Sequence, residues 1–414
     1  MNADGTTSCY RIALILIGIT INPILLASPS IGHQLSLDQA ILVIAVGALI
    51  LAVVGVMNGM VGEYARKNTY QIVPFAFGLK GGHAIDTLLG IGLLGWVCVS
   101  INGFAQALQG LLATGGYTLP FWIASAVGCI AVIAATALGF DALSRVTMYA
   151  IPVIVLLLFY SLDRFLGVLS FHRPSIALAG TDHASLGVAI STVVGSCMVV
   201  VVTLPDFGSL ARNRMHALVG VILAMAVACP LLYFAGALPS ALTGKNSLVG
   251  AMAVATSTLP VLCVLLLATI TGGAGTLFQA TLVTFKFLPR ISKAKITVVL
   301  GIFAGLVGSM SIMSWFVPFL LFLGIAIPPV AGIYLADFIL HRYRAGYDEA
   351  ALAAQPAVRA STFVAWAIAS AIGFMTSHQD FTLTTVPSLD SLLVACVLYT
   401  LFSRACAHCS KQRA

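Results

Sequence analysis

Charged residues are scarce in this chain of 414 residues: they make up 8% of it, whereas hydrophobic residues make up 60%. A soluble domain carries roughly 25% charged residues, so a water-facing surface cannot be covered with so few. The apolar runs are continuous and do not alternate with polar residues, which argues against a β-barrel. Because a helix needs roughly 20 apolar residues to cross a bilayer, the composition predicts an all-α, polytopic membrane protein.

A cleavable leader, a cysteine framework and a catalytic cluster are also missing. The first apolar run, Ile12 to Ala27, has no clear cleavage site and is expected to be a retained helix. Six of the nine cysteines lie inside apolar runs, where they behave as small apolar residues. The eight histidines lie in loops or at helix ends. Since a membrane-embedded enzyme needs converging nucleophiles, bases or metal ligands, we expect no enzyme, no cofactor and no metal.

Twelve membrane-spanning helices are predicted from the apolar runs. With the N-terminus inside, 17 of the 20 Lys and Arg residues fall in cytoplasmic segments, and only Arg164, Arg173 and Lys245 lie outside. Cytoplasmic loops are enriched in basic residues, so this bias supports twelve spans with both termini in the cytoplasm. The net charge of +7 is then a topology signal that needs no nucleic-acid partner, although basic loops can touch anionic lipid. The predicted spans are 11–28, 39–61, 84–113, 119–140, 146–168, 186–204, 216–239, 259–285, 297–313, 316–340, 358–375 and 389–402.

The first span carries a predicted break near mid-depth. Transport requires polar groups or unwound backbone near the bilayer midplane, shielded from lipid. Pro23 has no N–H, so the carbonyl of Ile19 loses its helical partner and becomes free to bind a cation or a ligand donor. Asn22 adds an amide beside it. A tolerated proline kink is the alternative.

The third and sixth spans offer further polar groups at similar depth. Trp96 provides a flat stacking surface and one N–H donor, and Ser100 lies on the same helical face four residues later. Ser196, next to Cys197, offers a hydroxyl in a run of small residues. Packing between helices explains these residues nearly as well.

The eighth span reads TGGAGT from Thr271 to Thr276. Its glycines weaken a helix by roughly 1 kcal/mol each and leave room for a ligand, so we predict exposed backbone near Gly273. Close helix packing is the alternative. Two other segments stand out: 63–83, predicted to be an interfacial loop, and the prolines from Ile327 to Val330, predicted to form a hinge or a static kink.

No ionisable side chain is predicted at the midplane. Asp86, Asp206 and Asp337 lie near the cytoplasmic ends of spans, and we expect them to pair with basic residues such as Arg212 and Arg342. A proton relay through the centre of the membrane usually needs a carboxylate there, and this chain is predicted to have none. Neutral carbonyls and hydroxyls suit Na⁺ or the facilitated movement of a neutral solute.

Four stretches of the chain resemble the nucleobase–cation symporter family. They are FAFGLKGG (75–82) with Gly95-Trp96, TLPDFGSLARN (203–213), SKAKITVVLGI (292–302) and IPPVAGIYLADFIL (327–340). The resemblance implies a LeuT-like fold of two inverted five-helix repeats plus two C-terminal helices. The repeats would cover about 11–168 and 186–340 of a transporter core, 1–376, with helix twelve and a cytoplasmic tail in 377–414. The family imports nucleobases and related heterocycles, commonly with Na⁺ or H⁺.

The predicted pocket departs from that family's pattern. Ile21, Asn22 and Cys197 stand where aromatics are expected, and the eighth span lacks two asparagines that would bind a base edge. The family's pattern has a pair of hydroxyl residues in the eighth span that resembles a sodium site, and in this chain only Thr271 of that pair remains. A site without its polar pairs cannot strongly select a polar substrate. The sequence therefore leaves open whether cytosine is the substrate and whether transport is coupled to Na⁺.

The prediction is therefore a secondary active transporter that imports a nucleobase-like heterocycle across a bacterial inner membrane by alternating access. The alternatives are a transporter of another small solute without Na⁺ coupling and a non-transporting membrane sensor. The sequence leaves the coupling ion, Na⁺ or H⁺, and the oligomeric state open. The predicted substrate-binding residues are Asn22, Trp96, Ser100, Ser196, Cys197 and Gly273, and the predicted cation ligands are Ile19, through its carbonyl, and Thr271.

Overall fold

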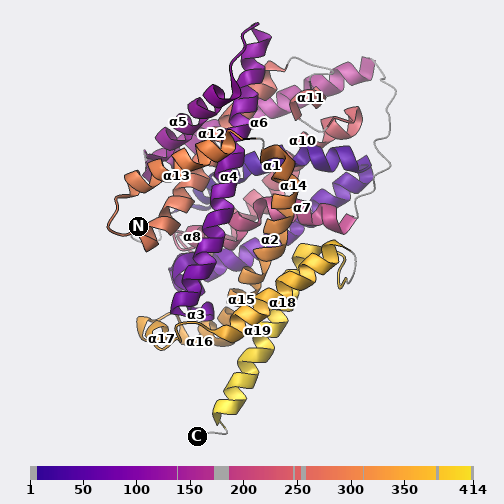
Figure 1. The fold of residues 1–414 in the computed structure, drawn as a ribbon. Helices are drawn as coiled ribbons and strands as arrows, with labels where there is room; N and C mark the ends of the chain where they lie inside the picture. Colours follow the sequence, from indigo (N-terminus) through magenta and orange to yellow (C-terminus); the bar gives the residue numbers. More distant parts are fainter. Residues whose placement is uncertain are drawn as a thin grey trace.

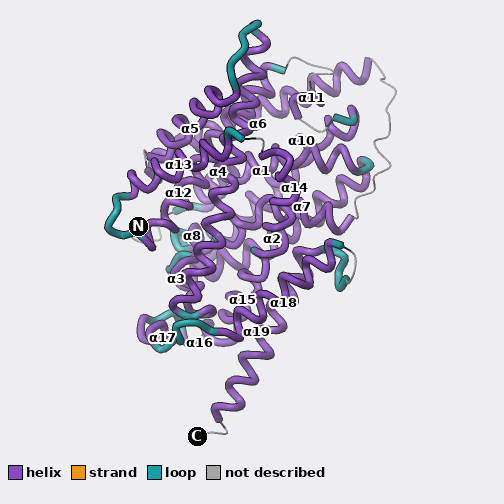
Figure 2. Tube along the Cα trace, viewed as in Figure 1, coloured by secondary structure: helices purple, strands orange, loops and turns teal. Residues whose placement is uncertain are grey.

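The computed structural model describes residues 7–137, 139–171, 186–245, 248–252, 258–310, 312–378 and 382–411. This part of the chain is helical, with one isolated β-bridge between Thr7 and Ala211 and no strand (Figures 1 and 2). The longer helices are α1 (Cys9–Gln34), α2 (Leu37–Ala65), α4 (Leu79–Thr114), α5 (Phe121–Ala137), α6 (Gly139–Phe171), α7 (Leu186–Val202), α10 (Cys229–Thr243), α12 (Leu259–Phe287), α13 (Lys293–Gly308), α14 (Phe316–Ala326), α15 (Pro328–Asp337), α18 (Ala360–Ser377) and α19 (Pro387–Lys411). The short ones are α3 (Thr69–Phe77), α8 (Pro205–Gly208), α9 (Arg214–Val221), η1 (Ile222–Ala228), α11 (Leu248–Met252), η2 (Ile312–Trp315), η3 (Phe338–Arg342), α16 (Tyr343–Ala345) and α17 (Glu349–Ala353).

The predicted all-α membrane class is confirmed. Each predicted span overlaps a helix or a run of consecutive helices. In the described part of the chain, eight helical segments are long and apolar enough to cross a membrane, or nine if the two halves of bent α1 count as one span. The helices α5 and α7 are apolar but shorter. The number twelve therefore stays a prediction.

The segment 63–83 is not the loop that we predicted. It contains the last residues of α2, the whole of α3 and the start of α4, with Gly78 between α3 and α4 at a φ of 89°. Asn68 begins α3 with a capping box: its side chain accepts from the Gln71 N–H, and the Gln71 side chain accepts from the Asn68 N–H. A capping box satisfies two backbone donors that a helix start leaves free, which explains why the helix begins here in an apolar context.

Helix packing brings the N-terminal and central parts of the chain together. Helix α12 packs along α4, and α1 packs along α10 and against α12. At the α1–α10 contact a Cβ on Gly32 would lie 2.1 Å from the Ala237 carbonyl oxygen, so only glycine allows this approach. The last two helices, α18 and α19, pack against each other and against α15, and the end of α19 projects beyond the bundle (Figure 1).

Candidate functional site: the α1–α4–α12 contact and the neighbouring cavity

Helix α1 is bent at the position that the sequence predicts. The halves Cys9–Asn22 and Ile24–Gln34 meet at 55°, with Pro23 between them. A proline leaves the carbonyl four residues earlier without its helical donor, and that carbonyl belongs to Ile19. The Ile19 oxygen lies 3.4 Å from where a Cβ on Gly272 would be, so it faces α12.

Asn22 connects the bend to α4. Its Nδ2 donates to the Ser100 Oγ at 2.6 Å, and the Ser100 hydroxyl donates to the Trp96 carbonyl at 2.7 Å. All three residues are buried. The Asn22 Oδ1 has no hydrogen-bond partner in the described part of the chain. A buried acceptor without a partner costs free energy, which a ligand N–H can recover.

The glycines of α12 make this contact possible, but they do not unwind the helix. Helix α12 is continuous from Leu259 to Phe287, so its backbone is not unwound at Gly273, and a role of Gly273 in substrate binding stays a prediction. A Cβ on Gly272 would lie 2.7 Å from the Asn22 Cβ, and one on Gly273 would lie 3.0 Å from the Ser100 Cβ. The glycines therefore admit side chains of α1 and α4, as the packing alternative predicted.

Trp96 lies beside this contact and packs against α14. Its ring meets Phe316 and Phe319 edge to face, with ring centroids 6.0 Å and 5.6 Å apart. The side chain is 3% exposed. The structure thus shows the packing role, and stacking on a substrate stays a prediction.

The two predicted cation ligands both belong to residues at the α1–α12 contact, and their joint binding of an ion stays a prediction. The Thr271 hydroxyl bonds to the carbonyls of Leu267 at 2.9 Å and Ala268 at 3.2 Å, so its proton is used within α12 while its oxygen keeps lone pairs for an ion. Thr271 precedes Gly272, which the Ile19 carbonyl faces. The pair supplies hard oxygen donors of the kind that Na⁺ prefers. No group of three or more His, Cys, Asp or Glu side chains in the described residues could hold a metal ion.

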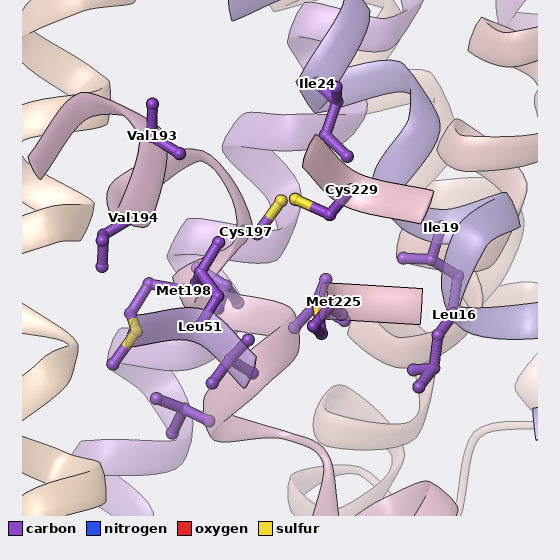
Figure 3. Packing of buried hydrophobic residues seen from close by; sticks show 14 of the residues in the cluster. Leu16, Ile19, Ile24, Leu51, Val193, Val194, Cys197, Met198, Met225 and Cys229 are labelled. Atoms are coloured by element: carbon purple, nitrogen blue, oxygen red, sulfur yellow. The ribbon is translucent and has the colours of Figure 1, made fainter. Parts of the chain in front are cut away.

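Ser196 and Cys197 face a different neighbour, α10. The Ser196 hydroxyl bonds to the Tyr233 hydroxyl and to the Val193 carbonyl. Figure 3 shows the sulfur atoms of Cys197 and Cys229 directed toward each other. Helix α7 is unbroken over these positions. The structure does not bring this pair into hydrogen-bond contact with Asn22 or Ser100.

A cavity of about 550 Å³ adjoins the contact on the side of α3, α8 and the start of α13. Ile19 and Gly275 line it, whereas Asn22, Trp96, Ser196 and Thr271 do not. Most of the predicted site residues therefore lie outside this cavity. The charge bias of the sequence predicts that this end of the bundle faces the cytoplasm.

Charged residues concentrate around this cavity. Lys286 Nζ binds Asp86 Oδ2 at 2.5 Å and the Tyr70 carbonyl oxygen at 2.8 Å. Away from this cavity, Asp337 pairs with Arg342 at 3.3 Å, as predicted. Asp206 differs from the prediction, because it makes no ion pair within the described residues.

Instead, Asp206 accepts a hydrogen bond from the Thr69 backbone N–H at 2.7 Å, at the start of α3. Burial raises the pKa of the Asp206 carboxyl to about 7. The hydrogen bonds from Thr69 offset part of the rise, and the nearby Asp86 carboxylate adds to it.

Sequence reasoning missed two polar residues in the cavity wall, Gln279 and Tyr70. Gln279 is 2% exposed, and its Nε2 donates to the Thr203 Oγ1 at 3.3 Å. Neither the Gln279 Oε1 nor the Tyr70 hydroxyl has a partner in the described part of the chain. The available signal was an isolated amide inside the apolar run of α12, since polar residues within such helices are costly and tend to be functional.

Comparisons with known proteins agree with this architecture. Residues 4–398 match the sequence profile of the family described as permeases for cytosine/purines, uracil, thiamine and allantoin. The chain belongs to this family. It is thus a multi-pass membrane transporter, and the predicted family, transporter class and non-enzymatic nature are confirmed.

Individual relatives support the same conclusion. The cytosine permease of Escherichia coli (strain K12) is 28% identical over 315 residues, which cover 76% of this chain and 74% of the relative. Among solved structures, Mhp1, a nucleobase-cation-symport-1 family transporter in a closed conformation with bromovinylhydantoin bound, superposes with a TM-score of 0.84 at 20% identity, over 98% of this chain and 94% of that one. A Na⁺-coupled sialic acid symporter in a substrate-bound outward-open state superposes with a TM-score of 0.70 at 11% identity, over 98% and 91%. These likenesses show the fold.

Proposed function

We propose that this transporter imports a small, flat, neutral heterocycle of the nucleobase type across a bacterial inner membrane, by alternating access and with both termini in the cytoplasm. Family membership supports the substrate class, since the profile describes permeases for cytosine, purines, uracil, thiamine and allantoin. The bound hydantoin in Mhp1 is a flat heterocycle as well. Which heterocycle this chain prefers depends on its own polar groups.

One observation carries the proposal: the unpartnered Asn22 Oδ1 at the bend of α1, held by the 2.6 Å bond from Asn22 Nδ2 to Ser100. An amide oxygen fixed in this way accepts a ring N–H and fixes the orientation of a planar ligand. Trp96, one turn before Ser100 on the same helix, supplies a ring face when the Phe316 and Phe319 contacts loosen. Gly273, which has no side chain, lets Ser100 lie against α12 at this position.

The remaining predicted substrate residues, Ser196 and Cys197, take part indirectly. Ser196 holds Tyr233, and Cys197 meets Cys229, so they set the packing of α7 on α10. In alternating access, one group of helices rocks against another around a fixed site. We propose that Ser196 and Cys197 belong to the contact between α7 and α10 that moves during alternating access.

We propose Na⁺ as the coupling ion, held by the Ile19 carbonyl and the Thr271 hydroxyl. Two hard oxygens at a helix bend suit an alkali cation, and the freed carbonyl has no helical donor. The Na⁺-coupled sialic acid symporter shares the fold, which permits but does not require this coupling. Proton coupling is the second candidate, because the Asp206 carboxyl has a pKa near 7 beside the cavity.

The test is uptake into proteoliposomes of radiolabelled cytosine, uracil, adenine, hypoxanthine and hydantoin, with a Na⁺ gradient, a pH gradient or neither. We expect accumulation of at least one compound, driven by the Na⁺ gradient. Trp96→Ala should lose that uptake while the protein is still expressed and folded. No uptake of any compound under the three conditions would refute the proposed substrate class, and uptake that follows the pH gradient alone would replace Na⁺ with H⁺.

A further inference from the structure

The cavity beside the α1–α12 contact has polar walls that the proposed central site does not use. It is lined by Tyr70 of α3, Asp206 of α8 and Gln279 of α12, together with aromatic rings such as Phe207 and Phe278. Its volume of about 550 Å³ lies in the range of small-molecule pockets, roughly 300–1,000 Å³. A few polar groups among aromatic walls are the usual makeup of such pockets.

We propose that this cavity is a second binding station for a neutral, flat heterocycle that carries ring N–H donors. The station would lie between the central site and the cytoplasm. The inference rests on the proposed function and adds to it the location of a second site and the groups that recognise the ligand there.

The unused groups in the wall are mainly acceptors. Gln279 Oε1 is buried and has no partner in the described part of the chain. Asp206 accepts from the Thr69 N–H and makes no ion pair among the described residues. The Tyr70 hydroxyl, which both donates and accepts, also lacks a partner there. Unsatisfied buried groups favour a ligand that pairs with them.

Two of the three basic side chains that line the cavity already bind carboxylates, and the third, Lys293, lies over the Phe285 ring. Lys286 is held by Asp86 and by the Tyr70 carbonyl. Arg66 binds Glu63 at 2.9 Å and the Ala211 carbonyl at 2.6 Å. A ligand with N–H donors therefore fits the remaining acceptors better than a phosphate or a carboxylate does.

The sequence of α12 explains why an amide appears at this place. From Gly272 to Gly275 the helix has no side chain that could bind a base edge, and this space is filled by Asn22, Ser100 and Ile19. The amide of α12 occurs instead at Gln279, about two helical turns farther along. Ile19 and Gly275 contact each other and also line the cavity, so the two stations adjoin.

The experiment measures equilibrium binding of the same five radiolabelled compounds to the purified full-length protein in detergent. The expected result is two equivalents bound per chain, of which Gln279→Leu removes one and Asn22→Leu the other. Tyr70→Phe should weaken the second equivalent by about three- to tenfold, as expected for one lost hydrogen bond.

Tyr347→Phe is the matched control. The Tyr347 hydroxyl is also buried and has no partner where the structure describes the chain, but this residue does not line the cavity. Because neither hydroxyl has a hydrogen-bond partner among the described residues, both substitutions should leave the fold intact. Tyr70→Phe therefore tests the second station even if Gln279→Leu does not fold. Binding should be unchanged in Tyr347→Phe.

The outcomes separate the two proposals. In one outcome, the unmodified protein binds only one equivalent of ligand, which Asn22→Leu removes and which Gln279→Leu and Tyr70→Phe leave unchanged. That result would refute the second station and leave the proposed function standing. One equivalent that Gln279→Leu alone removes would support the station and refute the central assignment of Asn22. No binding of any compound to the unmodified protein would refute the substrate class and the station together.

Discussion

The ion pair between Lys286 and Asp86 gives the sharpest prediction about stability. The Asp86 side chain is 0% exposed, whereas the Lys286 side chain is 30% exposed, and they meet at 2.5 Å. At an effective dielectric constant of about 20, the gross attraction at this distance is about 7 kcal/mol, most of which offsets the cost of removing both charges from water. Removing one partner leaves the other charge to bear that cost alone.

The two single substitutions should therefore have unequal effects. Lys286→Met strands a fully buried carboxylate, and breaking a buried pair in this way costs about 3–5 kcal/mol. Asp86→Asn leaves a lysine that still reaches solvent and still binds the Tyr70 carbonyl, so we expect a loss of about 1–2 kcal/mol. The double variant should recover part of the Lys286→Met loss.

The assay is thermal unfolding in detergent for the four proteins under one set of conditions. The melting temperature should fall in the order unmodified protein, Asp86→Asn, Lys286→Met, with the double variant above Lys286→Met. Equal losses in the two single variants, or a double variant whose loss is the sum of theirs, would refute the argument that burial of Asp86 makes the pair asymmetric.

Two further predictions concern packing and pH. Gly272→Ala should lower the melting temperature, because overpacking against Asn22 costs about 1–3 kcal/mol and exceeds the gain in helix propensity of about 1 kcal/mol. Gly167→Ala in α6 should raise the melting temperature, because open space surrounds Gly167. The raised pKa of Asp206 means that the folded protein binds this proton more tightly than the unfolded chain does, so stability should decrease as the pH rises from about 4 through about 7. Asp206→Asn should flatten that decrease in a series of melting curves, and an unchanged slope would show that another group causes it.

The helices could be predicted from sequence because their physical cause is local. Continuous apolar runs placed the middle of every described long helix, although α1, α6 and α19 extend six to nine residues beyond a predicted end, and Pro23 marked the bend of α1. The loop predicted over 63–83 failed for an equally local reason. The Asn68–Gln71 capping box begins a helix there, and the prediction gave more weight to the glycines and to Pro74 than to this cap.

The side-chain partners could be predicted less well, because they depend on how each helix is rotated about its axis. A helix that is apolar all round, as α7 and α12 nearly are, carries no polar stripe to show which face meets which neighbour. Asn22 and Ser100 did come together, whereas Ser196 turned toward Tyr233. Gln279 passed unnoticed because its role depends on a cavity between α3, α8 and α12, which are distant in sequence.

The central claim is that the amide of Asn22, fixed by Ser100 at the bend of α1, recognises the transported heterocycle. The most direct measurement is the initial rate of uptake by Asn22→Leu in proteoliposomes, with Asn102→Leu as control. Asn102 is also a buried amide, but it binds the Gly308 carbonyl at the far side of α4 from this site. We predict that Asn22→Leu lowers the initial rate of uptake at least tenfold. Asn102→Leu should keep the rate of the unmodified protein, once corrected for the amount of folded protein. A rate for Asn22→Leu equal to that of the unmodified protein would contradict the claim.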